Sequence, residues 1–225
     1  MLDDRLPDGR GVWLHDPAGT DPAEPLPVAV VLDGERWAGV GLPATLDGLL
    51  ARGDLPPVRT GGVASGPLAQ RSRELACDPS FVAVLRDDVL GWAAERRALS
   101  AEPGRTAVVG QSLGGLTALY ATQVAPERFG LALSQSGSFW WPNPVRRRRG
   151  RVAHLGGARR AAHPRRPPRG RDGGVGPARA DPPAALRAAG PRRPGAAPAF
   201  RGGHDLACWR AGLADALAGL LRGTP

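Results

Sequence analysis

The sequence contains no lysine, and all 30 of its basic side chains are arginines. It has two cysteines, Cys77 and Cys208, which are too few for a disulfide framework and fit a reduced cytoplasmic compartment. We expect both to be small buried hydrophobes. No run of about 18 apolar residues occurs, which excludes a conventional membrane-spanning helix. Residues 1–4 are acidic and no apolar segment follows them, so we expect no secretory signal.

The net charge of +9 is distributed unevenly along the chain. Residues 146–198 contain 15 arginines and two acids, Asp172 and Asp181, which gives +13, while the rest of the chain carries −4. The basic charge therefore belongs to one segment of an otherwise slightly acidic protein. The absence of lysine indicates a GC-rich coding bias more than phosphate recognition, so nucleic acid is not the expected partner.

The most informative stretch is centred on Ser112. A short β-branched run, residues 106–109, leads into Gly-Gln-Ser-Leu-Gly at 110–114, and a helix-forming segment then continues to Val124 before Pro126. This is a G-x-S-x-G pattern between a strand and a helix, the setting of a nucleophile elbow. The glycines permit a sharp turn that projects the serine hydroxyl, and the helix N-terminus favours a nearby oxyanion. A merely structural tight turn is the alternative.

The remaining patterns predict one α/β domain of 225 residues with a mostly parallel sheet. Alternating or continuous apolar runs predict strands at 11–16, 27–33 and 129–136, and helical spacing predicts helices at 42–52, 79–99 and 206–221. The last helix carries an apolar stripe made of Leu206, Trp209, Leu213, Leu217 and Leu220. Residues 59–66 are too rich in glycine to predict a core strand.

Residues 145–198 differ in character from the rest of the chain. They contain no aromatic residue and consist mainly of Arg, Pro, Ala and Gly, a composition typical of disorder. We therefore predict that the domain is incomplete or disordered there. Two compensating reading-frame shifts in a GC-rich gene would produce the same mixture, and peptides recovered across 146–198 would contradict that hypothesis.

A serine needs a neighbouring base to become a nucleophile, and His204 is the best candidate. It follows the elbow, lies beside Gly202 and Gly203, and precedes the last helix, which matches the α/β-hydrolase order of serine, acid and histidine. A surface histidine is the alternative. His15 lies in an early strand, and the other two histidines lie in the arginine-rich stretch.

The acid that would orient the histidine is the weakest assignment. Asp172 is the first choice and Asp181 the second, although neither follows a strand-like run. Asp205 is adjacent to His204 and badly placed to accept its ring proton, and a Ser-His dyad remains an alternative. The oxyanion hole would use the N–H of Leu113 and an N–H from the loop at Gly34 and Glu35. We expect neither a cofactor nor a metal site.

Five blocks of the sequence resemble the catalytic domain of enterochelin (enterobactin) esterases of the esterase D type. They are Leu-Asp-Gly-Glu-Arg-Trp at 32–37, Arg-Ser-Arg-Glu-Leu at 71–75, Gly-Gln-Ser-Leu-Gly-Gly at 110–115, Ser-Gln-Ser-Gly-Ser-Phe-Trp-Trp at 134–141 and Gly-Gly-His-Asp-Leu-Ala-Cys-Trp-Arg at 202–210. The resemblance covers roughly residues 10–142 and 199–221 and is most specific in the last two blocks. It implies an α/β-hydrolase fold, with Ser112 as nucleophile and His204 as base.

The same resemblance implies hydrolysis of a catecholate siderophore ester, typically the trilactone of ferric enterobactin, with release of iron inside the cell. Trp37, Trp140 and Trp141 are candidates to stack on catechol rings, although one or two of them could instead be core residues. Arg36 and Arg73 could meet the anionic ferric complex. A general carboxylesterase or acyltransferase is the alternative enzyme, and an inactive remnant with a basic binding segment is the alternative outside catalysis.

Overall fold

The computed structural model describes residues 1–141 and 203–222. The predictions for residues 145–198, including the composition-based disorder and the acids Asp172 and Asp181, fall outside these residues.

Within the described residues, six strands form one mixed sheet in the order β1-β2-β4-β3-β5-β6. The four strands from β4 to β6 are parallel, and β2 and β1 extend the sheet in antiparallel orientation. The predicted, mostly parallel α/β sheet is confirmed. The strands are β1 (Leu2–Arg5), β2 (Gly11–His15), β3 (Val28–Leu32), β4 (Arg59–Val63), β5 (Thr106–Gln111) and β6 (Leu131–Gln135).

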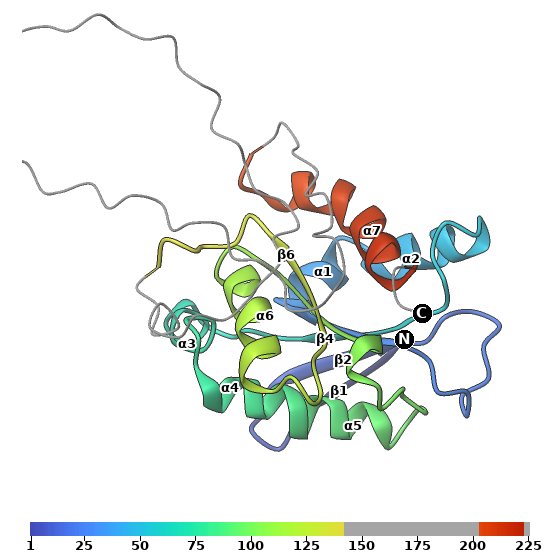
Figure 1. The fold of residues 1–225 in the computed structure, drawn as a ribbon, viewed down its shortest axis with the longest axis horizontal. Helices are drawn as coiled ribbons and strands as arrows, with labels where there is room; N and C mark the ends of the chain where they lie inside the picture. Colours follow the sequence, from blue (N-terminus) through green and yellow to red (C-terminus); the bar gives the residue numbers. More distant parts are fainter. Residues whose placement is uncertain (142–202, 223–225) are drawn as a thin grey trace, which may run out of the picture.

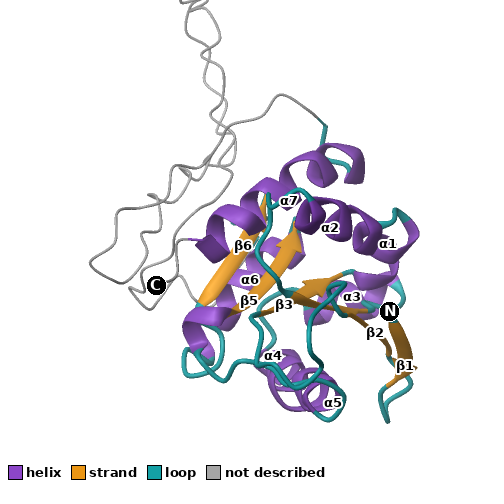
Figure 2. Cartoon of the chain, turned by 90° about the vertical axis from the view of Figure 1, so that its right-hand side faces the viewer, coloured by secondary structure: helices purple, strands orange, loops and turns teal. Residues whose placement is uncertain are grey.

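Helices cover both faces of this sheet, so the molecule has three layers (Figure 1). Successive residues of β3 supply the two cores: Val28 and Val30 join the cluster under α4, α5 and α6, while Ala29 and Val31 join the cluster under α1, α2 and α7. Figure 2 shows α7 lying beside α2 on the second face. The helices are α1 (Gly34–Gly39), α2 (Leu42–Ala51), α3 (Leu68–Glu74), α4 (Pro79–Ala83), α5 (Leu90–Ala94), α6 (Leu113–Val124) and α7 (Leu206–Arg222).

Most of the predicted elements are confirmed. The predicted strands correspond to β2, β3, β5 and β6, and the helix predicted at 42–52 is α2, followed by Gly53 with a φ of 74°. The helix predicted at 79–99 is α4 and α5 joined by a π-helical segment, Val84–Val89, and it ends earlier, at Ala94. The stripe on α7 faces the core, where Leu213 and Leu217 are fully buried.

The interpretation of the glycine-rich stretch at 59–66 was wrong, because it contains β4, all five residues of which are buried. Its glycines accommodate close neighbours. A Cβ on Gly62 would lie 2.0 Å from the Trp13 ring, and a Cβ on Gly34 would lie 2.5 Å from the backbone nitrogen of Val63. The indole of Trp13 also donates a 2.8 Å hydrogen bond to the carbonyl of Gly34. The strand therefore lacks side chains where Trp13 and α1 pack onto it.

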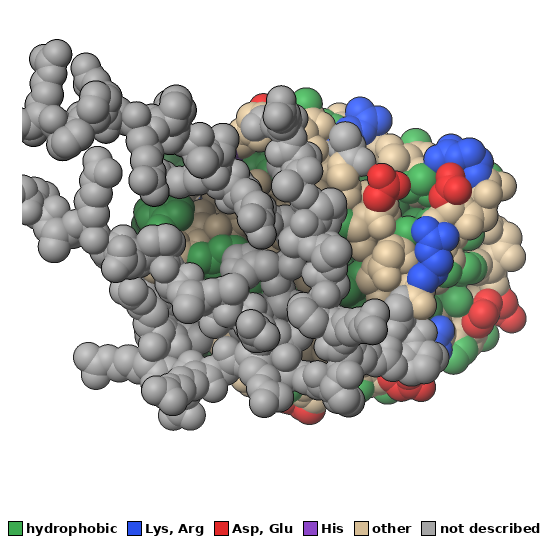
Figure 3. All heavy atoms as spheres, turned by 45° about the horizontal axis from the view of Figure 1, so that its top comes forward, with side chains coloured by type: hydrophobic (Ala, Val, Ile, Leu, Met, Phe, Trp, Pro, Cys, Tyr) green, Lys and Arg blue, Asp and Glu red, His purple; other side chains and the backbone are tan. Residues whose placement is uncertain are grey.

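The surface of the described part mixes charges of both signs. The described residues include 14 arginines and 19 acids, most of them at the surface, and Figure 3 shows the two kinds side by side on one face. No helix in the described ranges is long and apolar enough to cross a membrane.

The two cysteines differ in burial. Cys77 is buried as expected, but Cys208 is only half-buried, so the prediction of a core position is wrong for the second cysteine.

Candidate active site

Ser112 occupies a sharp turn between β5 and α6, which confirms the predicted strand-turn-helix geometry. Its φ of 56° and ψ of −120° are unusual for a residue with a side chain and cost on the order of 1–3 kcal/mol. The surrounding glycines make the turn sterically feasible. A Cβ on Gly110 would lie 2.3 Å from the backbone of Gly114, and one on Gly115 would lie 2.6 Å from Ser134 Oγ. The backbone thus holds the serine in a conformation that leaves its side chain partly exposed.

The end of β6 and the loop that follows it make three hydrogen bonds with Ser112. The N–H of Ser112 donates to the carbonyl of Gln135 at 3.1 Å, and the N–H of Ser138 donates to the carbonyl of Ser112 at 2.9 Å. The two hydroxyls, Ser112 Oγ and Ser138 Oγ, are 3.1 Å apart and share a hydrogen bond. The sequence analysis missed Ser138. The signal was present in the block at 134–141, which was interpreted only through its tryptophans.

The residues predicted to form the oxyanion hole lie at the N-termini of two neighbouring helices. Leu113 begins α6, and Gly34 and Glu35 begin α1, so their N–H groups have no acceptor within their own helices. The two helix starts are close together, because a Cβ on Gly114 would lie 3.8 Å from Asp33 Oδ2. Unpaired N–H groups at a helix start are donors of the kind that an oxyanion hole uses.

A buried ion pair fixes the start of α1. Asp33 adopts a left-handed conformation with a φ of 57° and accepts two hydrogen bonds from the Arg71 guanidinium, at 2.5 and 2.7 Å. These bonds raise the pKa of Arg71 above its ordinary value. Two parallel bonds between planar groups also define the orientation of the pair. Asp33 therefore takes part in a salt bridge, which the sequence analysis did not predict.

His204 lies at the same edge of the sheet as Ser112. Its ring packs edge-to-face on Trp209 with a centroid separation of 4.8 Å, and Trp209 Nε1 donates to Ser136 Oγ at 3.1 Å. Ser136 belongs to the loop that also holds Ser138 against Ser112. The imidazole is exposed. Among the described residues, the hydrogen-bond partner of Ser112 Oγ is Ser138 and not His204.

Asp205 directly precedes α7 and caps its first turn. Its Oδ1 accepts a 2.9 Å hydrogen bond from the N–H of Cys208, and this bond is the main cause that lowers the pKa of Asp205. That Asp205 is badly placed to accept the ring proton of His204 stays a prediction. Asp172 lies outside the described residues.

The predicted substrate-contacting residues divide into exposed and buried groups. Trp140 is 76% exposed and meets Trp141 edge-to-face at 5.7 Å. Arg36 is exposed, and the Arg73 side chain is 69% exposed. The prediction that Trp37 stacks on a catechol ring is wrong. Trp37 is fully buried, and its indole N–H donates a hydrogen bond to Gln111 Oε1 at 3.0 Å. Trp37 is a core residue because α1 folds back over the sheet, and it cannot stack on a ligand.

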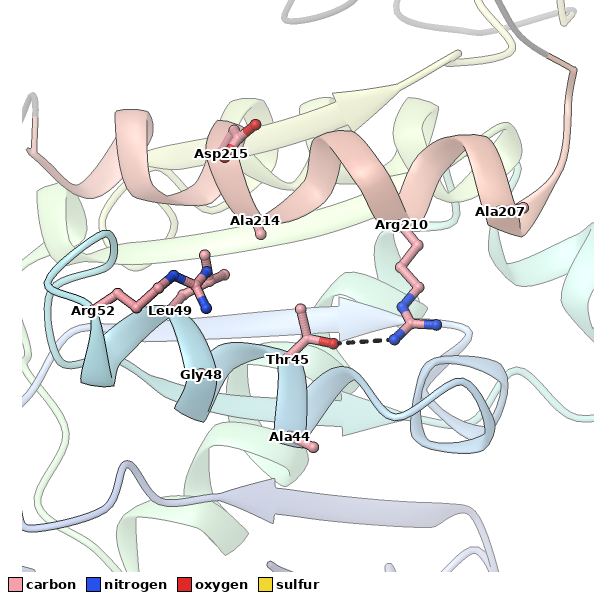
Figure 4. Close-up of a pocket in the computed structure, with 9 residues that line it drawn as sticks. All are labelled: Ala44, Thr45, Gly48, Leu49, Arg52, Ala207, Arg210, Ala214 and Asp215. Atoms are coloured by element: carbon pink, nitrogen blue, oxygen red, sulfur yellow. Dashed lines mark hydrogen bonds between the residues drawn. The ribbon is translucent and has the colours of Figure 1, made fainter.

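Two further features of the described residues concern metal binding and surface pockets. No group of three or more His, Cys, Asp or Glu side chains there is arranged to hold a metal ion. A surface pocket of about 540 Å³ lies between α2 and α7, away from the elbow (Figure 4). Arg210 reaches across one end of it to Thr45 Oγ1 at 3.4 Å. None of the residues predicted for the active site lines this pocket.

Comparisons with known proteins agree with this geometry. Residues 4–166 match the model of the family Esterase, described as "Putative esterase". The iron(III) enterobactin esterase of Dickeya dadantii is 43% identical over 141 residues, which cover 62% of this chain and 32% of that protein. The iron(III) salmochelin esterase of Escherichia coli O6:H1 is 33% identical over 135 residues, 59% of this chain and 33% of that protein.

Solved structures show the same relationship. The Shigella flexneri enterobactin esterase, solved in the presence of enterobactin, superposes with a TM-score of 0.58 and 38% identity over 63% of this chain and 37% of that one. The ferric enterobactin esterase of Salmonella typhimurium gives 0.58 and 36% over 64% of this chain and 37% of that one. The chain spans about a third of the length of the curated relatives it matches. With its sheet order, its serine elbow and a family match over most of its length, the chain belongs to the Esterase family of α/β-hydrolases.

Proposed function

We propose that the protein is a serine esterase that hydrolyses an ester bond of a catecholate siderophore, with Ser112 as nucleophile and His204 as general base. The observation that carries the proposal is the strained conformation of Ser112 between the N-termini of α1 and α6. A serine held in this way at the carboxyl edge of a parallel sheet is prepared for nucleophilic attack. The relatives named as enterobactin and salmochelin esterases support the substrate class.

The proposed reaction proceeds through an acyl-enzyme. Ser112 Oγ attacks the ester carbonyl carbon while His204 accepts the hydroxyl proton. The N–H groups of Leu113 and of Gly34 or Glu35 stabilise the oxyanion of the tetrahedral intermediate. The alkoxide then leaves with the proton from His204, and a water molecule, deprotonated by the same histidine, releases the acid and restores Ser112. Ser138 would release the serine hydroxyl, which it engages in the resting enzyme.

The substrate proposal is an enterobactin-like trilactone carrying ferric iron. Trp140 and Trp141 offer aromatic faces beside the nucleophile loop, and Arg36 and Arg73 offer exposed positive charge for the anionic complex. Asp172 remains the proposed orienting acid. The cytoplasmic setting predicted from the two cysteines also stays a prediction.

A fluorophosphonate probe, which phosphonylates activated serines with loss of fluoride, tests the catalytic assignment. We expect it to label the full chain at Ser112, and we expect Ser112→Ala and His204→Ala each to lower hydrolysis of p-nitrophenyl acetate by about 10⁴-fold or more. Ser80→Ala, which changes an exposed serine at the start of α4, is the matched control and should leave both signals unchanged. Equal labelling of wild type and Ser112→Ala would contradict the proposal.

Substrate class requires a second comparison. Faster hydrolysis of ferric enterobactin than of simple p-nitrophenyl esters, measured as kcat/KM, supports the siderophore assignment. Equal or slower hydrolysis would indicate a general carboxylesterase. No turnover together with steeply salt-dependent DNA binding would indicate an inactive remnant with a basic segment.

A further inference from the structure

Two buried glutamine side chains connect the elements that carry the proposed catalytic groups. Gln111 and Gln135 end β5 and β6 and are only 2% and 6% exposed. Nε2 of Gln111 donates to Oε1 of Gln135 at 3.0 Å. Because an amide side chain donates and accepts at the same time, each glutamine can make a further hydrogen bond in the opposite direction.

On one side the connection extends into α1. Trp37 Nε1 donates to Gln111 Oε1 at 3.0 Å, and the Trp37 side chain is fully buried. Trp37 is in the first turns of the helix that begins with Gly34 and Glu35. The hydrogen bond of Gln111 therefore determines where the N–H groups of these two residues lie relative to Ser112, the next residue after Gln111.

On the other side the connection extends into α7. Gln135 Nε2 donates to the backbone carbonyl of Trp209 at 3.0 Å. The helix lies close to this amide, since a Cβ on Gly212 would be 3.6 Å from the same nitrogen. Trp209 supports the His204 ring, and the backbone carbonyl of Gln135 accepts from the N–H of Ser112. Gln135 thus contacts the support of the proposed base and the backbone of the proposed nucleophile.

We propose that Gln111 and Gln135 are positioning residues that set the placement of His204 and of the oxyanion N–H groups relative to Ser112. The proposal rests on the proposed function of Ser112 and His204. Neither amide touches substrate: Gln111 acts through Trp37, and Gln135 acts through Trp209. Apolar side chains of similar volume could fill the same space, but only directional hydrogen bonds fix how α1 and α7 are rotated against the elbow.

Steady-state kinetics with p-nitrophenyl acetate test the proposal in the full chain. We expect Gln111→Met and Gln135→Met each to lower kcat about tenfold to hundredfold, because small displacements of catalytic groups are costly, with KM changed less than about twofold. The control is Thr117→Val, which removes another buried hydrogen bond, from Thr117 Oγ1 to the carbonyl of Leu75 at 2.7 Å. It should change kcat by less than about twofold. All variants are assayed well below their unfolding temperatures.

The double variant separates positioning from a general loss of stability. If both amides belong to one connection, Gln111→Met/Gln135→Met should lose little more kcat than the worse single variant. Losses that multiply in the double variant would overturn the shared connection between the two amides, and a loss in Thr117→Val equal to that of the amide variants would overturn the positioning proposal.

An NMR measurement tests positioning without reference to catalysis. The ring protons of His204, identified by the signals missing in His204→Ala, should carry a ring-current shift from Trp209. We expect Gln135→Met to move these signals and Thr117→Val to leave them in place. If they do not move in Gln135→Met, the positioning proposal is wrong even when Ser112 reacts with fluorophosphonate. If Ser112 does not react, the proposed function fails, and the NMR result still decides the positioning.

Discussion

The regions around Ser112 and His204 are held in place in different ways. Around Ser112, backbone atoms are so close that a Cβ on Gly110 would lie 2.3 Å from the next turn. Around His204, the imidazole is exposed, and its position depends on Trp209 and on the side chains that Trp209 contacts. Ser112 is therefore fixed mainly by local backbone sterics, and His204 by tertiary side-chain contacts. Substitutions that add atoms near Ser112 should therefore destabilise the protein strongly, while substitutions near His204 should have smaller effects.

One glycine from each region gives the largest expected contrast. In Gly110→Ala the new Cβ meets the backbone of Gly114, which cannot move without breaking the turn, so we expect a loss of about 4 kcal/mol or more in the free energy of unfolding. In Gly203→Ala the Cβ meets only Asp205 Oδ2, the end of an exposed side chain that can rotate, so the loss should be at most about 1 kcal/mol. Urea unfolding of both variants measures the difference. Similar losses would show that the two regions are equally rigid.

Substitutions of two arginines, one near each region, test the same difference between the surroundings of Ser112 and His204, with smaller expected effects. Arg71→Met leaves the buried Asp33 carboxylate without its partner, which should cost about 3–4 kcal/mol of unfolding free energy. Arg210→Met removes an exposed side chain of α7 that makes a long hydrogen bond of 3.4 Å to Thr45 Oγ1, so the change should stay within about 0.5 kcal/mol. Thermal or urea unfolding measures both. A near-neutral Arg71→Met would mean that the start of α1 does not depend on the ion pair.

The smallest expected effect concerns the cap that precedes α7. The pKa of Asp205 is lowered from 3.8 in the folded protein, chiefly by the N–H of Cys208. Since the folded pKa lies below the unfolded one, the carboxylate stabilises the fold above the unfolded pKa, and this contribution is lost as the pH falls through the folded pKa.

The urea midpoint of the wild type should therefore exceed that of Asp205→Ala at neutral pH, and the gap should narrow as the pH drops below about 3.8. Asp205→Asn keeps an oxygen acceptor without the titrating charge. The difference in urea midpoint between Asp205→Asn and Asp205→Ala should therefore not depend on pH. A gap between wild type and Asp205→Ala that is unchanged in acid would refute the role of the charge.

The sequence predicted the features that arise from local pattern. The elbow at Ser112, the buried strand β3 and the amphipathic α7 follow from glycine placement and apolar periodicity, which act over a few residues. The interpretation of β4 failed because the reason for Gly62 is the distant Trp13 ring. Local composition cannot reveal such a partner.

The candidate site could be predicted only in part, because some of its contacts join residues that are distant in the sequence. Which tryptophan is core and which is exposed depends on tertiary burial, so Trp37 and Trp140 could not be told apart. Ser138 contacts Ser112 only because β6 lies beside β5. The Asp33–Arg71 pair likewise joins residues 38 positions apart. Side-chain partners at this distance emerge only once the sheet order is known.

The exposure of Trp140 has a practical consequence for observing the site. Of the six tryptophans in the chain, Trp140 is the one that is largely exposed to solvent, at 76%. It lies two residues after Ser138, whose hydroxyl contacts Ser112 Oγ. Its fluorescence should therefore be emitted at longer wavelength than that of the buried indoles and be quenched first by iodide. Ferric catecholates absorb light and quench nearby fluorophores, so the native protein contains an intrinsic optical probe for the arrival of such a ligand beside Ser112.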